Sequence, residues 1–364
     1  MYFILFFILI ISLSLILFLK HPQFGKMPSG NRLDEIKKAK NYSNGSFQNL
    51  NHTPPLAEGA NMFSILKDFL FKKSNTKPLK KIPSLKTDLL NLAIEKDVLV
   101  WFGHSSYYIQ IDKKRILVDP VFSGSASPLP FGVKSFNGSD IYTTDDIPEI
   151  DYLFITHDHW DHLDYKTIKK LTPKIKKVIC ALGVGEHLEH WGYHKNLIIE
   201  KNWNEEIKLE DGFIAHTVPS RHFSGRGIKR NASLWTSYVL ITPTMKIFIG
   251  GDSGYDTHFA EIGNTFGSFD LAIIENGQYN KNWRYIHLLP DEILKVAKEL
   301  NTKRLFPVHN SKFNLSLHSW DEPMSLIIEN NKTENISLIT PQIGEQVNLK
   351  DTTQKFTEWW KEIS

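Results

Sequence analysis

Cysteine is almost absent from this sequence of 364 residues, in which Cys180 is the only one. Disulfide bonds within the chain therefore cannot contribute to the fold, and no cysteine near the N-terminus is available to carry a lipid. A strong charge of one sign is lacking as well, because 43 Lys and Arg residues oppose 40 Asp and Glu residues. The net charge of +3 is too small to indicate nucleic acid as a partner.

Two kinds of pattern are also missing. No internal repeat of fixed period is visible, and no Gly-x-Ser-x-Gly motif occurs, so a serine hydrolase with a nucleophile elbow is not expected. Hydrophobic residues make up 41% of the chain and aromatic residues 12%. This composition is sufficient for the sizeable buried core of a globular protein.

Charge is absent from Phe3 to Leu19, an apolar run long enough for a minimal membrane-spanning helix. A cleaved signal peptide is the competing interpretation. Signal peptides normally have a basic start and a small-x-small cleavage site, and neither Met1-Tyr2 nor the exit Phe18–Pro22 provides them. We therefore expect residues 1–20 to form an N-terminal membrane anchor, with a signal peptide as the alternative.

Six basic residues follow the apolar run, and no basic side chain precedes it. They are Lys20, Lys26, Arg32, Lys37, Lys38 and Lys40. The positive-inside rule then predicts a single-pass protein whose catalytic domain is cytoplasmic, with a periplasmic or extracytoplasmic location as the alternative. Turn signals in residues 21–94 predict an irregular tether and N-terminal extension. The lysines of 67–86 either rest on anionic lipid or belong to a solvated basic linker or a helix packed on the domain.

Beyond residue 94, short apolar runs rich in branched and aromatic residues predict β-strands. They span 98–102, 107–111, 116–118, 152–155, 177–181, 214–218, 237–241, 246–249, 271–274 and 304–308. Helical patterns fall at 164–171, 183–191 and 290–300. We expect one α/β domain over residues 95–364, an αββα sandwich of two mixed β-sheets with outer helices, on which Trp359-Trp360 packs.

Three histidines and an aspartate gather within six positions, directly after the strand-like run 150–155. They are His157, His159, Asp161 and His162. Imidazole nitrogens are good zinc ligands, and an interleaved carboxylate can serve a second cation nearby. A chance cluster is the alternative, since the chain has 15 histidines. The strand-then-ligand context favours a metal site, in which Asp158 and Asp164 face solvent or orient the loop.

The loop provides only part of the ligands that two metal ions need. Three further candidates stand where a strand-like run gives way to a loop: His222 after 213–218, Asp252 after 247–249 and His309 after 304–308. Two divalent cations that share an oxygen ligand can share a water, lower its pKa and present hydroxide to an ester or phosphodiester. The pattern thus predicts a hydrolase with a binuclear metal centre.

This order of ligands resembles that of the metallo-β-lactamase superfamily. Further segments resemble the branch that contains N-acyl-phosphatidylethanolamine-hydrolysing phospholipase D and its bacterial relatives: Trp101–Ser106, Ile116–Ser123, Asn231–Trp235 and Gly251–Tyr255. The resemblance covers most of residues 95–345 and implies the metallo-β-lactamase fold. It also implies two Zn²⁺ ions per chain, one held by His157, His159 and His222 and the other by Asp161, His162 and His309. Asp252 would bridge them, and Asp161 and Asp252 are the expected catalytic residues.

A histidine that binds a metal through one ring nitrogen usually donates the N–H of the other to a carboxylate or carbonyl. This rule predicts residues that support the ligands. Asp119 is the candidate for this role, with a turn-forming Asp-Pro pair as the alternative. His104 either supports the site or is a structural histidine. In the polar and aromatic loop 274–287, Gln278, Arg284 and His287 are the candidates for substrate binding. His287 matches a histidine that the resembling branch places near the substrate phosphate, and Arg284 is suited to pair with an anion.

These expectations lead to three hypotheses about function. The first is a membrane-associated, zinc-dependent phosphodiesterase of the phospholipase D type that acts on N-acylphosphatidylethanolamine or a related phospholipid. The second keeps the metal site but takes a lactone or another soluble ester, as the similar ascorbate-6-phosphate lactonase branch implies. The third is a metal-binding membrane scaffold without turnover, which the full set of seven ligands disfavours because a structural zinc needs four. A homodimer is compatible with each hypothesis.

Overall fold

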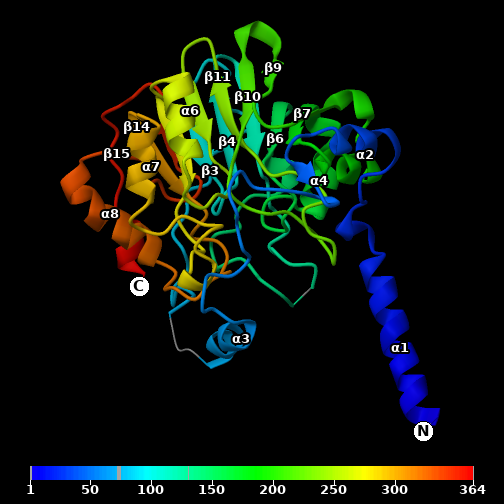
Figure 1. Cartoon of the computed structure of the whole chain (residues 1–364). Coiled ribbons are helices and arrows are strands. Elements are labelled where there is room, and N and C mark those ends of the chain that lie inside the picture. Colours follow the sequence, from blue (N-terminus) through cyan, green and yellow to red (C-terminus); the bar gives the residue numbers. More distant parts are fainter. Residues whose placement is uncertain (1, 72–74, 130, 364) are drawn as a thin grey trace.

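The computed structural model describes residues 2–71, 75–129 and 131–363. Its body consists of two seven-stranded β-sheets packed face to face, with helices on the outer side of each sheet (Figure 1). This is the predicted αββα sandwich. The ten predicted strands and three predicted helices are all present. The strands that the sequence did not predict are short and lie at sheet edges, with the exception of a small hairpin.

The first sheet has the strand order β16-β3-β4-β5-β6-β7-β8. Neighbours from β5 to β8 are parallel, and the remaining pairs are antiparallel. Because β5 and β6 are parallel, the residues that follow them lie at the same edge of the sheet. The strands are β3 (Val98–Trp101), β4 (Tyr107–Ile111), β5 (Lys114–Val118), β6 (Ile150–Ile155), β7 (Ile175–Ala181), β8 (Ile198–Lys201) and β16 (Gln346–Asn348).

The second sheet has the order β15-β14-β13-β12-β11-β10-β9. Neighbours from β12 to β15 are parallel, and β9 to β12 alternate in direction. The strands β10, β12 and β14 therefore all end at one edge, which faces the ligand-bearing edge of the first sheet. The strands are β9 (Glu206–Lys208), β10 (Ile214–Val218), β11 (Ser237–Ile241), β12 (Lys246–Ile249), β13 (Leu271–Glu275), β14 (Arg304–Val308) and β15 (Ser337–Leu338).

Successive residues of the central strands enter different cores. In β6, Phe154 packs between the sheets, whereas its neighbours Leu153 and Ile155 pack beneath the outer helices. Strands that are covered on both faces have continuous apolar sequences, and these apolar runs are the pattern that predicted them. Trp359 and Trp360 are buried in the inter-sheet core, as expected.

Helices cover both outer faces. The first sheet is covered by α4 (Tyr165–Leu171) and α5 (Val184–His190), and the second by α6 (His258–Phe266) and α7 (Ile293–Glu299). The sequence did not predict α6 or α8 (Glu322–Glu334). Both helices draw on contacts with distant residues, and short helices need such contacts to be stable.

The N-terminal helix α1 (Tyr2–Leu19) projects from the body and buries none of its residues (Figure 1). It is the one helix of the described chain that is long and apolar enough to cross a membrane. At 1.5 Å per residue it is about 27 Å long, close to the thickness of a bilayer's hydrocarbon core. Length and composition therefore agree with the predicted anchor.

The prediction of an irregular tether over residues 21–94 was wrong in part. This region contains α2 (Gly30–Lys37), the hairpin β1 (Tyr42–Ser43) and β2 (Ser46–Phe47), and α3 (Met62–Phe71). Arg32 of α2 forms ion pairs with Glu186, Glu189 and Glu200 of the domain. Interactions with residues more than 150 positions away hold the extension in place, so its local sequence carries only a weak helical signal.

Residues 21–26, here named the strap, join α1 to the body. The carbonyl of Pro22 accepts a hydrogen bond from Trp191 Nε1 (2.7 Å), and that of Gln23 accepts from Arg226 Nε (3.1 Å). Lys26 N–H donates to His187 Nδ1 (3.0 Å). Gly25 has φ +72 and ψ −156, a backbone region that is essentially restricted to glycine. A Cβ at this position would lie 2.0 Å from His187 Nδ1.

We therefore predict that Gly25→Ala destabilises the protein by about 1–3 kcal/mol, through backbone strain and displacement of His187. The midpoint of thermal unfolding, followed by tryptophan fluorescence, measures the effect. Gly45→Ala is the matched control, because Gly45 also has a positive φ (+77) but meets nothing within 4 Å. An equal loss of stability in both variants would show that the contact with His187 is unimportant.

Candidate metal centre

The predicted metal loop follows β6 and turns tightly at the edge of the first sheet. His162 N–H and Leu163 N–H both donate to His159 O, at 3.1 and 2.8 Å. Asp164 then caps α4 by accepting from Lys166 N–H (3.2 Å). This turn brings the side chains of His157, His159, Asp161 and His162 to one side of the loop.

Asp158 and Asp164 are buried, so the expectation that they face solvent was wrong, whereas the alternative that they orient the loop was right. Asp158 accepts hydrogen bonds from Gly225 N–H and Ser233 Oγ, both at 2.7 Å, and lies 3.2 Å from His187 Nε2. Arg226 Nη1 donates to Asp158 O (2.8 Å) and Leu163 O (2.6 Å). Arg226 and His187, which bind the strap, thus also contact the metal loop.

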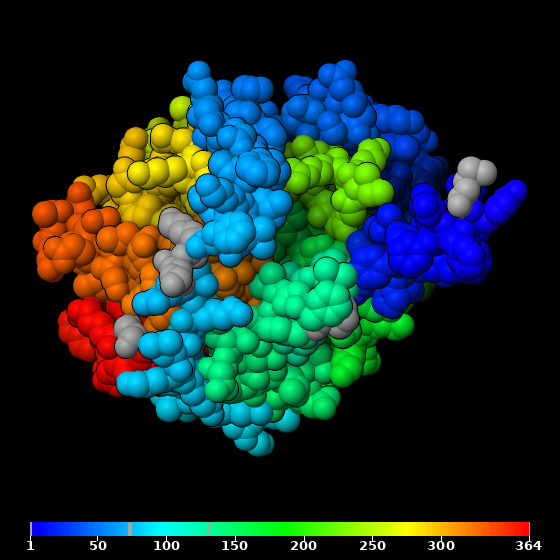
Figure 2. Space-filling model, turned by 90° about the horizontal axis from the view of Figure 1, so that it is seen from below, coloured from blue at the N-terminus to red at the C-terminus, as the bar shows by residue number. Residues whose placement is uncertain are grey.

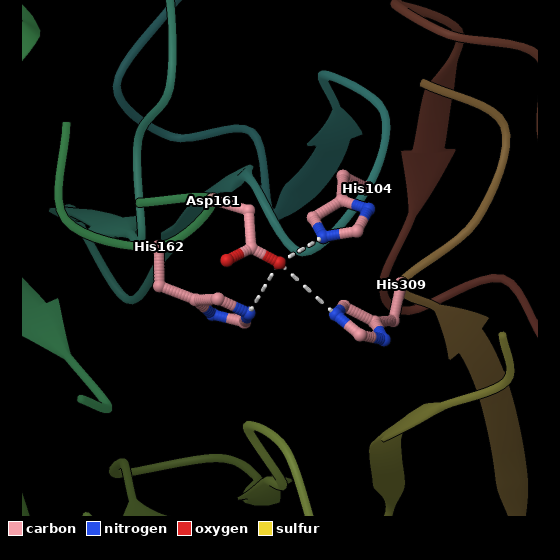
Figure 3. Close-up of side chains that lie close together, drawn as sticks. All are labelled: His104, Asp161, His162 and His309. Atoms are coloured by element: carbon pink, nitrogen blue, oxygen red, sulfur yellow. Dashed lines mark hydrogen bonds and ion pairs between the residues drawn. The ribbon is translucent and has the colours of Figure 1, made fainter. Parts of the chain in front are cut away.

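The three downstream candidates meet the loop from the second sheet, where His222 follows β10, Asp252 follows β12 and His309 follows β14. All seven predicted ligands lie in two groups of potential donor atoms, within 4.8 Å of one another in each group. One group is His157, His159, His222 and Asp252, and the other is His104, Asp161, His162 and His309. Figure 3 shows the second group, in which three imidazoles converge on the Asp161 carboxylate.

Asp252 stands between the two groups. Its Oδ2 lies 3.8 Å from His157 Nε2 and 3.7 Å from His222 Nε2 on one side, and 3.2 Å from His309 Nε2 on the other. Its Oδ1 lies 3.2 Å from His162 Nε2. This position between both groups is the one that a carboxylate shared by two cations needs.

The donor atoms fit divalent cations. Burial lowers the pKa of His157 and His222 well below the usual value, so both imidazoles present uncharged nitrogens. His162 Nε2 and Asp252 Oδ1 are buried and face each other without a hydrogen bond. Unpaired buried polar atoms are rare in proteins, and a set of five histidines and two aspartates suits a zinc-like ion.

Hydrogen bonds to the Nδ1 atoms, on the side away from the centre of the site, orient His162 and His222. Asp119 lies 2.8 Å from His162 Nδ1 and accepts from Thr156 N–H (2.9 Å) and Thr156 Oγ1 (2.6 Å). Asp119 therefore occupies the supporting position that the sequence predicted. His222 Nδ1 is held by Ile286 O (2.8 Å). These bonds leave the Nε2 atoms of His162 and His222 directed toward the centre of the site.

His104 is part of the second group rather than a distant structural residue. Its Nε2 lies 2.8 Å from Asp161 Oδ2, and burial lowers its pKa to about 3. A neutral imidazole has one N–H, and donation of that N–H to Asp161 leaves Nδ1 free, in agreement with its lack of a hydrogen-bond partner. His104 thus fixes the orientation of the Asp161 carboxylate.

The predicted substrate-binding residues have different positions. Gln278 and His287 line a cavity of about 630 Å³ that opens onto the metal ligands. The Gln278 side chain also bonds the backbone, since it donates to Phe313 O (3.1 Å) and accepts from Leu315 N–H (2.9 Å). The Nδ1 of His287 is 2.6 Å from Glu275 Oε2. This bond leaves His287 Nε2 for the cavity.

Arg284 does not line the cavity, so the prediction that it binds substrate is not supported. Arg284 follows a short 3-10 turn, Lys281–Trp283, and its Nη2 lies 3.7 Å from Glu292 Oε1 on the surface. Trp283 lines the cavity instead, and the cationic side chain of the lining is Arg230. The sequence shows that this loop contains an arginine. The direction of its side chain depends on the 3-10 turn that precedes it and could not be predicted.

Sequence reasoning missed the contribution of the N-terminal extension. Asn49 accepts from His222 N–H (3.1 Å) and donates to His222 O (2.8 Å), across 173 positions. Met62 and Ile65 of α3 form part of the cavity wall. We found no local signal in the sequence that would have placed these residues at the site.

Comparisons with known proteins agree with this geometry. The Beta-lactamase superfamily domain matches residues 114–310. An uncharacterized protein of Mycobacterium tuberculosis is 31% identical over 338 residues, which are 89% of this chain and 88% of the relative. The Caenorhabditis elegans N-acyl-phosphatidylethanolamine-hydrolyzing phospholipase D 1 is 28% identical, over 67% of this chain and 74% of the relative.

A solved structure shares the fold. It is Igni18, a metallo hydrolase from the archaeon Ignicoccus hospitalis, with a TM-score of 0.52 and 20% identity over 70% of this chain and 98% of that chain. Family, fold and the convergence of buried histidines and aspartates lead to one conclusion. The chain belongs to the metallo-β-lactamase superfamily and is a metal-dependent hydrolase.

Proposed function

We propose that this protein is a binuclear zinc phosphodiesterase of the phospholipase D type, anchored in a membrane by α1, that cleaves N-acylphosphatidylethanolamine or a related phospholipid. The observation that carries the proposal is the combination of a polar floor and apolar walls in one cavity. The floor is formed by His159, Asp161, His222, Asp252 and His309, and the walls include Pro55, Leu56, Met62, Ile65, Trp283, Ile286 and Leu315. A phospholipid has the matching division into a charged phosphodiester and apolar chains.

Arg230 supports a phosphodiester as the reacting group. It is the cation among the described residues that line the cavity, and its guanidinium lies 5.0 Å from the centre of the Phe223 ring. A guanidinium can donate two parallel hydrogen bonds to a phosphate. Similarity to the Caenorhabditis elegans phospholipase D adds support, because that relative is named for the hydrolysis of an N-acylated phospholipid.

In this proposal His157, His159 and His222 would hold one zinc, and Asp161, His162 and His309 would hold the other. Asp252 lies between the two groups of ligands. When bound, the ions supply Lewis-acid chemistry and a water of lowered pKa for attack on phosphorus. His104 and Asp119 keep Asp161 and His162 in position. His287, held through Nδ1 by Glu275, presents Nε2 to the cavity. In its protonated form it carries a proton on both nitrogens and can donate the Nε2 proton to the departing oxygen.

Removal of metal tests the centre. Chelation should abolish hydrolysis of bis-p-nitrophenyl phosphate, and addition of zinc should restore it.

Asp252→Asn should lower turnover at least about 100-fold, because the charge shared by both groups is lost, while thermal unfolding still shows a folded protein. Asp34→Asn, at an exposed acid on α2, is the control. Unchanged turnover after chelation, or in Asp252→Asn, would contradict the binuclear centre.

His287→Asn tests the assigned proton donor. We expect turnover to fall about 100-fold or more while metal content, measured by mass spectrometry of the purified protein, is unchanged. His287 also belongs to a third group of potential donors with Asp252, Glu275 and His309. A loss of bound metal in His287→Asn would therefore identify His287 as a ligand instead of a proton donor.

The substrate can be identified by incubating the full chain in mixed micelles with N-acylphosphatidylethanolamine and analysing the products by mass spectrometry. Release of phosphatidic acid is the expected result, because a phospholipase D cleaves the bond between the phosphate and the headgroup alcohol. Parallel incubations with soluble lactones and esters address the alternative substrate class. Hydrolysis of these compounds alone would replace the phospholipase assignment with a lactonase or esterase.

A further inference from the structure

Helix α3 carries more apolar side chains than the protein covers. Ile65 is buried, Met62 lines the cavity, and Phe69 stacks on Trp283 with ring planes 9° apart. An adjacent side, here named the outer side, carries Phe63, Leu66 and Leu70, spaced three and four residues apart, and Phe63 is 79% exposed. Several large apolar side chains exposed next to one another normally mark a site of interaction. The outer side of α3 therefore indicates a second apolar environment.

Two loops on the same face of the protein also carry exposed apolar side chains. Phe131, in the loop after β5, is 81% exposed, and Ile228, in the loop after β10, is 86% exposed. Figure 2 shows this face directly, with a hollow bordered by α3 in light blue, the 225–231 segment in lime and the segments 125–129 and 131–135 in teal. Arg230 and Asn231 place the 225–231 segment at the rim of the metal cavity. Three segments that carry large exposed apolar side chains thus border this hollow.

Each apolar side chain has an exposed cation close to it in the sequence. Lys67 follows Leu66, Lys134 lies three positions after Phe131, and Lys229 follows Ile228. Lys77, Lys80 and Lys81 extend the basic character beyond α3, against one acidic residue of that helix, Asp68. Apolar side chains flanked by lysines are typical of surfaces that enter the interface of an anionic bilayer.

The direction of α1 agrees with this arrangement. In Figure 1, α1, α3 and the loop after β5 all project from the same side of the body. A bilayer crossed by α1 on this side would therefore lie on the side from which α3 and this loop project.

We propose that the outer side of α3, Phe131 and Ile228 form a docking face that enters the membrane interface, so that a lipid reaches the metal cavity from the bilayer without crossing bulk water. The inference deepens the proposed function, because it rests on α1 as the anchor and assigns a lipid as the substrate. The inner side of α3 then guides the acyl chains, while Arg230 and the metal ligands meet the headgroup phosphate.

A bilayer suits this face better than a second copy of the chain. In a symmetric dimer the same patch would meet itself and place the lysines of both copies next to each other. Anionic lipid headgroups instead offer opposite charge to each of these lysines, and acyl chains accept apolar side chains of any shape.

Depth-dependent quenching tests the docking face without any substrate. The full chain is placed in nanodiscs of phosphatidylcholine and phosphatidylglycerol that contain spin-labelled lipids, and Leu66→Cys carries an environment-sensitive fluorophore. Cys180 is buried and does not compete for the label. Lys208→Cys, on the exposed strand β9 at the far side of the body, is the matched control. We expect strong quenching at position 66 and none at position 208.

Absence of quenching at position 66, with the chain retained on the nanodiscs, overturns the docking face and leaves the anchor intact. A chain that does not stay on the nanodiscs overturns both. Quenching at position 66 in a protein that releases no phosphatidic acid supports the docking face but removes the phospholipase assignment. The two proposals can therefore fail separately.

Turnover gives an independent readout. In the triple variant Phe63→Ser, Leu66→Ser, Leu70→Ser, hydrolysis of phospholipid in nanodiscs should fall about tenfold or more, while hydrolysis of bis-p-nitrophenyl phosphate stays within about twofold of the wild type. Leu50→Ser removes an exposed apolar side chain elsewhere and serves as control. A parallel loss of both activities would show that α3 only supports the metal site and would contradict the docking face.

Discussion

The carboxylates of Asp161 and Asp252 lie at the floor of a cavity between two β-sheets, and Asp252 is 3.2 to 3.8 Å from four imidazole nitrogens. Burial of a carboxylate costs several kcal/mol unless the charge is paired or binds a cation. Two such groups side by side require a rigid frame. The parallel strand ends provide it, because each ligand follows directly on a buried strand whose backbone is fixed by its neighbours.

The frame also depends on residues outside the sheets. Arg226 lies 4.0 Å from the Trp160 ring and donates to the carbonyls of Asp158 and Leu163 on one side and of Gln23 on the other. One buried side chain therefore connects the metal loop to the strap at the base of α1. The N-terminal extension is part of the site's architecture, since Asn49 holds His222 and α3 closes one wall of the cavity.

The sequence predicted the sandwich and the seven metal-ligand candidates because both depend on local patterns: apolar runs of strand length, and acids or histidines where those runs end. The extension was not predictable in the same way. Its short helices are held by partners far along the chain, such as Arg32 with Glu186, and the apolar outer side of α3 resembles a core segment. Arg284 and Arg230 illustrate a second limit. Both are exposed arginines in polar loops, and only the path of the backbone determines which one faces the cavity.

The pairing of β16 with β3 has a consequence for biosynthesis. Val347 lies opposite Leu99, so the first strand of the sandwich receives its outer neighbour only when the end of the chain arrives. Trp359 and Trp360 enter the inter-sheet core from the same late segment. Such long-range contacts slow folding. The outer edge of the first sheet and the inter-sheet core are therefore completed only after His309, the last of the seven ligands, has been synthesised.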